Sequence, residues 1–287
     1  MRFVKTFSEN SGIKIEYINL SKSFDIASEE EKKDLTHIVK KMHAGLYSHT
    51  FTIKQEREDV SVWLKMLQSG LKNSQHIYVV FGRHLATEKP EILGFTIADI
   101  GGHTNCGLIE YVVRKRGFSS VLKGKDMLSY LEKELQTLNQ NLTGQKLKGI
   151  FWEANDPLKT DPSTDCMSPQ KRIDLIENEY GAKALGFSYI QGPLCPCKTP
   201  EEVESLICTN LKFYLFNANA YPNLTAQDIK NYIFHFNKIV NGAQNPRDLK
   251  SPEINKMMDE LEFMIEHNIS PILEKQTPEQ RAMLEQI

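Results

Sequence analysis

The sequence predicts a mixed α/β domain built around one sheet, followed by a C-terminal helical extension. Three observations support this fold class. Strand and helix patterns alternate along the first 220 residues, and the stretch Gly107–Leu138 reads as a strand, a basic loop and an amphipathic helix. Beyond Tyr221 only helical periodicity is found. We therefore expect residues 1–220 to form the α/β domain and residues 221–287 to form the extension.

The elements of the first hundred residues follow from periodicity and capping signals. Ser28 is a plausible N-cap before a run of acidic residues, and Gly94 lies inside a strand pattern, which marks a bulge or a close backbone approach. The polar connection 83–90 is expected to join its two flanking strands as an antiparallel pair. The expected strands are Ile13–Leu20, His76–Phe81 and Ile92–Ile100, and the expected helices are Glu29–Leu46 and Glu56–Leu71.

The central unit begins with Gly107–Val113, a nearly apolar run of strand length that contains one carboxylate, Glu110. The helix that follows has apolar residues at helical spacing from Met127 to Leu138. Cationic residues lie between the two elements, opposed by Asp126: Arg114, Lys115, Arg116, Lys123 and Lys125. A helix N-terminus with free N–H groups and nearby cations can bind an anion such as a phosphate. The alternative is an ordinary solvated basic loop.

The second half of the domain is expected to continue with strands and one helix. That helix is followed by Gly181, a glycine at the usual C-terminal position. The expected strands are Leu147–Glu153, Ala184–Leu194 and Ser205–Phe216, and the helix is Gln170–Tyr180. The expected helices of the extension are Thr225–Val240, Pro252–His267 and Pro271–Ile287.

Composition excludes several classes of protein. The chain has 40% hydrophobic and 25% charged residues, which are values of a globular protein. Its net charge of −2 argues against a nucleic-acid partner bound through a broad basic surface. No apolar run approaches the roughly 18 residues of a membrane span, so no membrane partner is expected. The start of the chain has no apolar signal core, which favours a cytoplasmic protein.

The five cysteines are an odd number and fit a reducing compartment better than a disulfide framework. Cys195 and Cys197 form a Cys-Pro-Cys string that could bind a metal or act as a redox pair. No second Cys or His pair stands at the spacing of a zinc finger, so we expect no metal.

Three strings together carry a family resemblance. They are KGKDML at Lys123–Leu128, FWEANDP at Phe151–Pro157 and YGAKALGFSYIQGPL at Tyr180–Leu194. In this order and spacing they resemble the GNAT superfamily of acyl-CoA-dependent N-acyltransferases, over roughly Ile13–Asn217. The resemblance implies a mostly antiparallel central sheet flanked by helices. It also points to a bacterial branch of the family that carries a helical tail.

The resemblance implies acetyl-CoA as co-substrate. In the family, the pantetheine arm lies beside the strand before the basic loop, and the pyrophosphate rests on N–H groups of a glycine loop at the helix start. Asp126 and Leu128 stand where that loop usually has small residues. The implied cofactor-binding residues are Tyr111, Val112, Val113, Lys123, Gly124, Lys125, Asp126, Met127, Leu128 and Asn155.

The implied reaction is transfer of an acetyl group to an amine of a small molecule or peptide by direct attack. Such a reaction needs a base and usually an acid. Glu110 and Glu153 are the candidate bases, Tyr180 is the candidate acid, and Gln191 could hold an amide of cofactor or substrate. A buried Glu paired for structural reasons, or an aromatic residue closing a helix, is the alternative in each case.

Two other functions remain open. One is a catalytically inactive GNAT-like module that works through protein partners or as a CoA-binding regulator, with the helical tail as a surface for homodimerisation or docking. The other is a bacterial protein delivered into another cell, which composition neither supports nor excludes.

Overall fold

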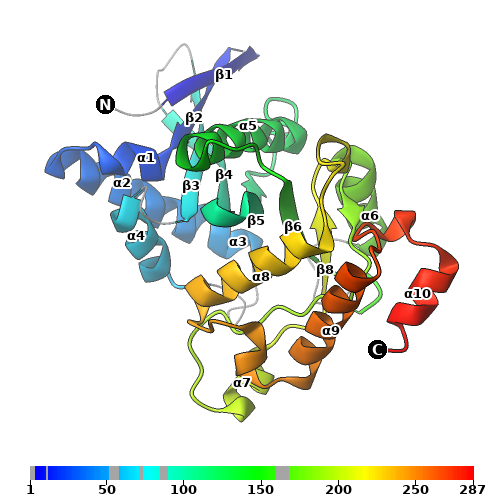
Figure 1. The fold of residues 1–287 in the computed structure, drawn as a ribbon. Helices are drawn as coiled ribbons and strands as arrows, with labels where there is room; N and C mark the ends of the chain where they lie inside the picture. The colour runs from blue at the N-terminus through cyan, green and yellow to red at the C-terminus, as the bar shows by residue number, and fades with distance from the viewer. Residues whose placement is uncertain (1–3, 11, 52–57, 71–73, 85–89, 160–167) are drawn as a thin grey trace. The chain divides into compact units, whose positions relative to one another are not determined.

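The computed structural model describes residues 4–10, 12–51, 58–70, 74–84, 90–159 and 168–287. The helices and strands of the chain are drawn in Figure 1. By their contacts they divide into two compact units. The first comprises Met1–Ile100 and Ile109–Leu135, and the second comprises Gly101–Leu108 and Gln136–Ile287. Strand β5 (Cys106–Arg114) and helix α5 (Gly124–Thr143) contribute residues to both units.

The strands of the first unit follow one another in chain order, as β1-β2-β3-β4-β5. The pairs β1–β2, β2–β3 and β3–β4 are antiparallel, as expected for the strands that flank residues 83–90. The sequence did not predict β1. The bounds are β1 Val4–Asn10, β2 Ile13–Asn19, β3 Gln75–His84 and β4 Pro90–Gly101.

Gly94, which the sequence predicted to mark a bulge or a close backbone approach, lies next to a β-bulge in β4. Val80 pairs with Gly94 and Phe81 pairs with Ile92, which leaves Leu93 as a bulged residue of β4. A Cβ atom on Gly94 would lie only 2.7 Å from the carbonyl oxygen of Val113 in β5. Gly94 therefore permits the close approach of β4 to the end of β5.

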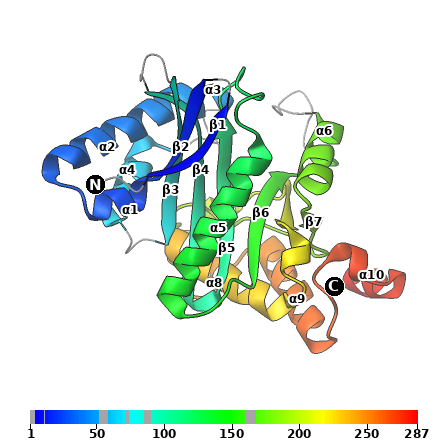
Figure 2. The same cartoon turned by 90° about the horizontal axis from the view of Figure 1, so that it is seen from above.

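Helices cover one face of the first unit's strands (Figure 1, Figure 2). Helix α2 begins with the predicted Ser28 cap, which forms a reciprocal capping box with Glu31. The helices are α1 Leu20–Asp25, α2 Glu29–Met42, a π-helical turn His43–Tyr47, α3 Ser48–Thr50 and α4 Val60–Ser69. The start of the predicted helix Glu56–Leu71 lies partly outside the described residues.

The core of the first unit lies between these helices and the strands. Ile18 of β2, Leu35 of α2 and Trp63 of α4 all belong to it. Because side chains alternate along a strand, Tyr17 points to the opposite face, where its ring lies 4.0 Å from that of Tyr130 in α5. The sheet of this unit is thus covered on both faces.

The second unit holds strands in the order β6-β8-β7, and both pairs are antiparallel. Its strands are β6 Gly149–Asn155, β7 Lys183–Ala184 and β8 Leu211–Leu215. Its helices are α6 Pro169–Ile173, a π-helical turn Asp174–Glu179, α7 Pro200–Leu206, α8 Ala226–Val240, α9 Pro252–Glu266 and α10 Pro278–Leu284. Short 3-10 turns are Gly102–Thr104, Ala218–Ala220, Pro246–Leu249 and Leu273–Lys275.

Two predicted strands were too long. Of Ala184–Leu194 only Ala184 lies in a strand, and Ser205 and Leu206 of the second predicted strand end α7 instead. Thr199 caps α7 through its side chain, with a proline at the first helical position. Pro193 and Pro196, which precede it, have no backbone N–H to donate to a regular ladder.

The predicted helix Pro271–Ile287 was also too long. It divides into the 3-10 turn Leu273–Lys275 and α10, because Thr277 caps a new helix that starts with Pro278.

The fold class predicted from the sequence is confirmed as mixed α/β with mostly antiparallel strand pairs flanked by helices. The C-terminal helices belong to the same compact unit as β6, β7 and β8. A domain boundary at residue 220 stays a prediction. Among the described residues, no helix is both long and apolar enough to cross a membrane.

Candidate functional site

The basic loop between β5 and α5 is held by its own hydrogen bonds. The Lys115 N–H donates to the Leu93 carbonyl (2.7 Å), and the Arg114 guanidinium donates to the Leu122 carbonyl (3.2 Å). The Lys115 ammonium pairs with Glu91 and lies 5.3 Å from the Phe118 ring centre. Two of the cations predicted to attract an anion therefore stabilise the loop itself.

The start of α5 keeps features of an anion site. Lys123 and Lys125 are exposed on either side of Gly124, the first residue of α5. The N–H groups of Asp126 and Met127 donate to the Lys123 carbonyl, at 3.1 and 3.2 Å. A helix leaves its first N–H groups without intrahelical partners, so those of Gly124 and Lys125 can take a ligand.

Met127 and Leu128, the two large apolar residues of the string KGKDML, are buried. Met127 and Leu128 are 0% and 1% exposed, so their side chains pack inward instead of covering the helix start. On β5, Tyr111 and Val113 pack against the core of the first unit, as their alternation predicts. The third candidate strand residue, Val112, lies between them and is half-buried.

Glu110 of β5 is half-buried and lies in the first unit. Its Oε1 atom accepts a hydrogen bond from the side-chain amide of Gln75, at 2.5 Å. This neutral donor holds the carboxylate in place at the beginning of β3.

Glu153 of β6 lies in the second unit, in a constellation with two polar side chains. Tyr189 donates its hydroxyl hydrogen to Oε1 of Glu153, and the Gln191 amide donates to Oε2 at 2.7 Å. Each carboxylate oxygen therefore accepts a hydrogen bond from a side chain. The residue as a whole is half-buried. Burial raises the pKa of Glu153 to about 7, while these two hydrogen bonds act in the opposite direction.

Packing and backbone pairing fix this constellation. The Tyr189 ring stacks on Phe213 of β8, with centroids 4.3 Å apart and planes at 9°. Phe213 is the direct partner of Glu153 in the β6–β8 register. Gln191 exchanges two backbone hydrogen bonds with Cys208, at 3.1 and 3.0 Å. Burial, together with the neighbouring Glu153 carboxylate, raises the pKa of Tyr189, so its phenol stays protonated as a donor.

A carboxyl group that titrates near pH 7 can accept a proton at neutral pH and return it later. Glu153 therefore has the protonation behaviour of a general base, and its partner Tyr189 is a residue that sequence reasoning did not select. The available signal was the spacing of Tyr189 and Gln191, which places both side chains on one side of an extended segment.

Tyr180 and Asn155, the remaining predicted site residues, make no hydrogen bond to Glu153 among those described. Tyr180 closes the π-helical turn, and its ring stacks on Trp152 with centroids 5.7 Å apart. Trp152 and Glu153 are neighbours on β6 and point to opposite faces, so Tyr180 packs on the face away from the Glu153 carboxylate. Asn155 ends β6, where it pairs with Leu211.

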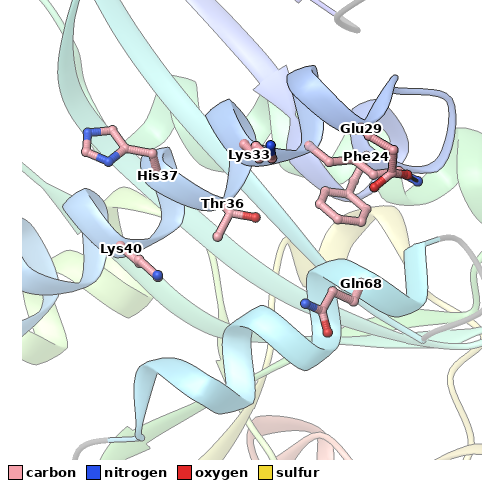
Figure 3. Close-up of a pocket in the computed structure, with 8 residues that line it drawn as sticks. Phe24, Glu29, Lys33, Thr36, His37, Lys40 and Gln68 are labelled. Carbon is pink, nitrogen blue, oxygen red and sulfur yellow. Dashed lines mark hydrogen bonds and ion pairs between the residues drawn. The ribbon is translucent and has the colours of Figure 1, made fainter.

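A pocket of about 630 Å³ in the first unit is lined by none of these residues (Figure 3). It is a groove of the first unit where Lys33 and Lys40 of α2 and Gln68 of α4 are exposed to solvent and Thr36 is half-buried. Lys32, which also lines it, pairs with Glu29 at 2.8 Å. These groups form a solvated helix face. No group of three or more His, Cys, Asp or Glu side chains suited to a metal ion occurs in the described part of the chain.

Comparisons with known proteins give matches to solved structures alone, all of low sequence identity. No protein-family model and no curated protein sequence matches this chain. An acetyltransferase of the GNAT family from Staphylococcus aureus matches with 14% identity and a TM-score of 0.39, over 71% of this chain and 99% of its own. The aminoglycoside 6'-N-acetyltransferase from Enterococcus faecium matches with 12% identity and a TM-score of 0.39, over 66% and 93%.

The ribosomal-protein-S18-alanine N-acetyltransferase from Escherichia coli also matches, with 10% identity and a TM-score of 0.33, over 59% of this chain and 83% of its own. The first of these structures is named for the family that the sequence resembles. Identities and TM-scores this low give no information about substrate or catalytic residues.

Proposed function

We propose that this protein is an N-acetyltransferase of the GNAT type, which transfers the acetyl group of acetyl-CoA to an amine of a small molecule or peptide. The observation that carries the proposal is the Glu153 carboxyl, held by Tyr189 and Gln191, with a pKa raised to about 7. Direct attack by an amine requires a base that is ionised at neutral pH and can still take a proton.

The proton transfers assigned to the protein are simple. The acceptor must lose a proton to expose the nitrogen lone pair that attacks the thioester carbonyl, and Glu153 accepts this proton directly or through a water molecule. The leaving thiolate of CoA takes a proton from the protein, and the proposed donor is the Glu153–Tyr189 pair. Tyr180 and Glu110 remain candidates for acid and base that no observation favours over this pair.

The start of α5 is proposed to hold the co-substrate. The Gly124 and Lys125 N–H groups, with the Lys123 and Lys125 ammonium groups, would take the pyrophosphate of acetyl-CoA. The backbone of Tyr111, Val112 and Val113 would run beside the pantetheine arm. The role of Asn155 as a cofactor-binding residue stays a prediction from the family resemblance. Acetyl-CoA supplies the activated acetyl group when bound.

A second function has one observation in its favour. The Asp126 carboxylate lies in the first turn of α5, where it stabilises the helix but repels a phosphate. A catalytically inactive module that works through protein partners is therefore the alternative, and homodimerisation through the C-terminal helices stays a prediction.

The described cysteines are all free thiols, which supports a reducing, cytoplasmic location.

The deciding experiment is calorimetric titration with acetyl-CoA, with CoA and desulfo-CoA as comparisons, followed by an amine panel assayed for CoA release. Micromolar binding and turnover that is lost in Glu153→Gln would support the enzyme. No binding by the folded protein would favour the partner-binding module. Binding with turnover unchanged in Glu153→Gln would support the reaction and exclude this base.

A further inference from the structure

The segment that presents Tyr189 and Gln191 to Glu153 is held from its other side by the C-terminal helices. It is irregular beyond Ala184, apart from isolated bridges at Leu185 and Gln191. The Ser188 N–H donates to Oε2 of Glu260 in α9 at 2.5 Å, and the Ile190 N–H is directed at the Met257 sulfur at 3.3 Å. Alternate residues of one short segment thus face Glu153 and α9.

Helix α8 holds the end of the same segment. A Cβ atom on Gly192 would lie 2.7 Å from Oδ1 of Asn237, so a larger residue there would displace the Asn237 side chain. Asn241 donates to the Pro193 carbonyl at 3.1 Å and to Asn237 at 2.9 Å. The two helices therefore determine where Tyr189 and Gln191 lie.

Glu260 is an unusual residue for the packed side of a helix. It is 3% exposed among the buried apolar residues Met257, Leu261 and Met264. Its cationic neighbour is Lys256, one helical turn away at 4.0 Å. Burying a carboxylate is unfavourable unless it is hydrogen-bonded, and a bond from a backbone N–H to a carboxylate is about twice as strong as a neutral one. A leucine would pack here without that cost, so the Ser188 contact explains the carboxylate.

We propose that Glu260 is a positioning residue for Glu153, acting through the Ser188–Gln191 segment that places the Tyr189 hydroxyl and the Gln191 amide on the carboxylate. The C-terminal helices are then an internal support of the candidate active site. This inference rests on the proposed role of Glu153 in acetyl transfer, but the support itself can be measured without activity.

The groups that face Glu153 determine whether its pKa rises or falls when the Ser188–Gln191 segment is loosened. They are the Tyr189 hydroxyl and the Gln191 amide, and the Cys208 thiol lies near Tyr189. Both hydrogen bonds favour the ionised carboxylate against burial. Loosening the segment weakens them, so the pKa of Glu153 rises.

The test is the pKa of Glu153 followed by NMR of carboxyl-¹³C glutamate in the full-length chain, with the signal assigned by Glu153→Gln. We expect Glu260→Leu, which removes the acceptor, to raise this pKa by about one unit. Glu260→Gln keeps the shape and a neutral acceptor, and a smaller rise is expected. Asp259→Asn is the matched control, since it removes the same charge one residue earlier from a side chain paired with Arg247 at the surface.

An unchanged or lowered pKa of Glu153 in a folded Glu260 variant overturns the proposal. If Glu260→Leu does not fold, the Glu260→Gln variant gives the answer. The pH profile of kcat for acetyl transfer should move in the same direction as the NMR value. Absence of transfer to any amine would remove the proposed function and leave the NMR result standing. Transfer without an NMR shift would remove only the role of Glu260.

Discussion

The Tyr189 hydroxyl donates a hydrogen bond to the Glu153 carboxylate, and so joins the irregular segment after β7 to strand β6. The phenol ring lies flat against Phe213, the strand partner of Glu153. Since ring and hydroxyl are both held, the carboxylate keeps a donor in a setting where burial alone would protonate it.

Glu153→Gln should lower turnover by on the order of 10²-fold or more, because general-base catalysis contributes that much. Acetyl-CoA affinity should not change, since the carboxylate is not among the groups assigned to the co-substrate. Steady-state kinetics and calorimetry measure the two effects. Glu274→Gln is the control, as Glu274 is an exposed residue paired with Lys183.

Glu110→Gln should leave turnover within a few-fold of the unmodified protein if Glu153 is the base. Its neutral partner Gln75 can still bond the substituted amide. A loss of turnover as large as that of Glu153→Gln, with unchanged acetyl-CoA binding, would move the base to Glu110.

Activity should rise with pH through about pH 7, as Glu153 becomes ionised. Tyr189→Phe removes one of the hydrogen bonds that lower this pKa, so the rise should move to higher pH. A pH series of kcat on both proteins measures the shift. A profile that keeps its midpoint in Tyr189→Phe would show that the phenol does not influence the titrating group.

The same carboxyl should make stability depend on pH. Its pKa is raised from 4.5 to about 7 on folding, so the folded state binds the proton more tightly and loses stability as pH rises between these values. The difference is on the order of 3 kcal/mol, from 1.36 kcal/mol per pKa unit. Denaturant unfolding at pH 4.5 and pH 8 should show this loss in the unmodified protein and not in Glu153→Gln.

Gly94→Ala should destabilise the protein by about 1–3 kcal/mol through overpacking. The added Cβ would lie 2.7 Å from the Val113 carbonyl oxygen and 3.0 Å from the end of Met127. Gly45→Ala is the matched control, because a Cβ there meets nothing within 4 Å. Equal effects of the two substitutions on the denaturation midpoint would contradict the close approach of β4 to β5.

Gly124→Glu should abolish acetyl-CoA binding and leave the fold intact, because a carboxylate would then occupy the first position of α5. Lys125→Glu should weaken binding more than tenfold, with Lys133→Glu on the same helix as the control. Calorimetry gives the affinities and circular dichroism verifies the fold. Full affinity in Gly124→Glu would place the co-substrate elsewhere.

Much of the fold could be predicted from short-range patterns in the sequence. Alternation in β2 and helical spacing in α8 and α9 identify those elements, and the Ser28 cap and the bulge at Gly94 were both predictable. The alternation, the helical spacing and the cap each depend on residues within a few positions of one another, whose dihedral preferences and hydrogen bonds act locally. Glu153 could be selected because it stands near the end of an apolar strand.

Tertiary structure alone decided which partner Glu153 has. Tyr180 and Tyr189 are both phenols of the same string, but Tyr180 packs on Trp152 and only Tyr189 donates to Glu153. That choice depends on how the chain returns over 36 residues to lie beside β6, and on the two helices that hold the returning segment. The raised pKa of Glu153 likewise comes from burial, which only the packed chain produces.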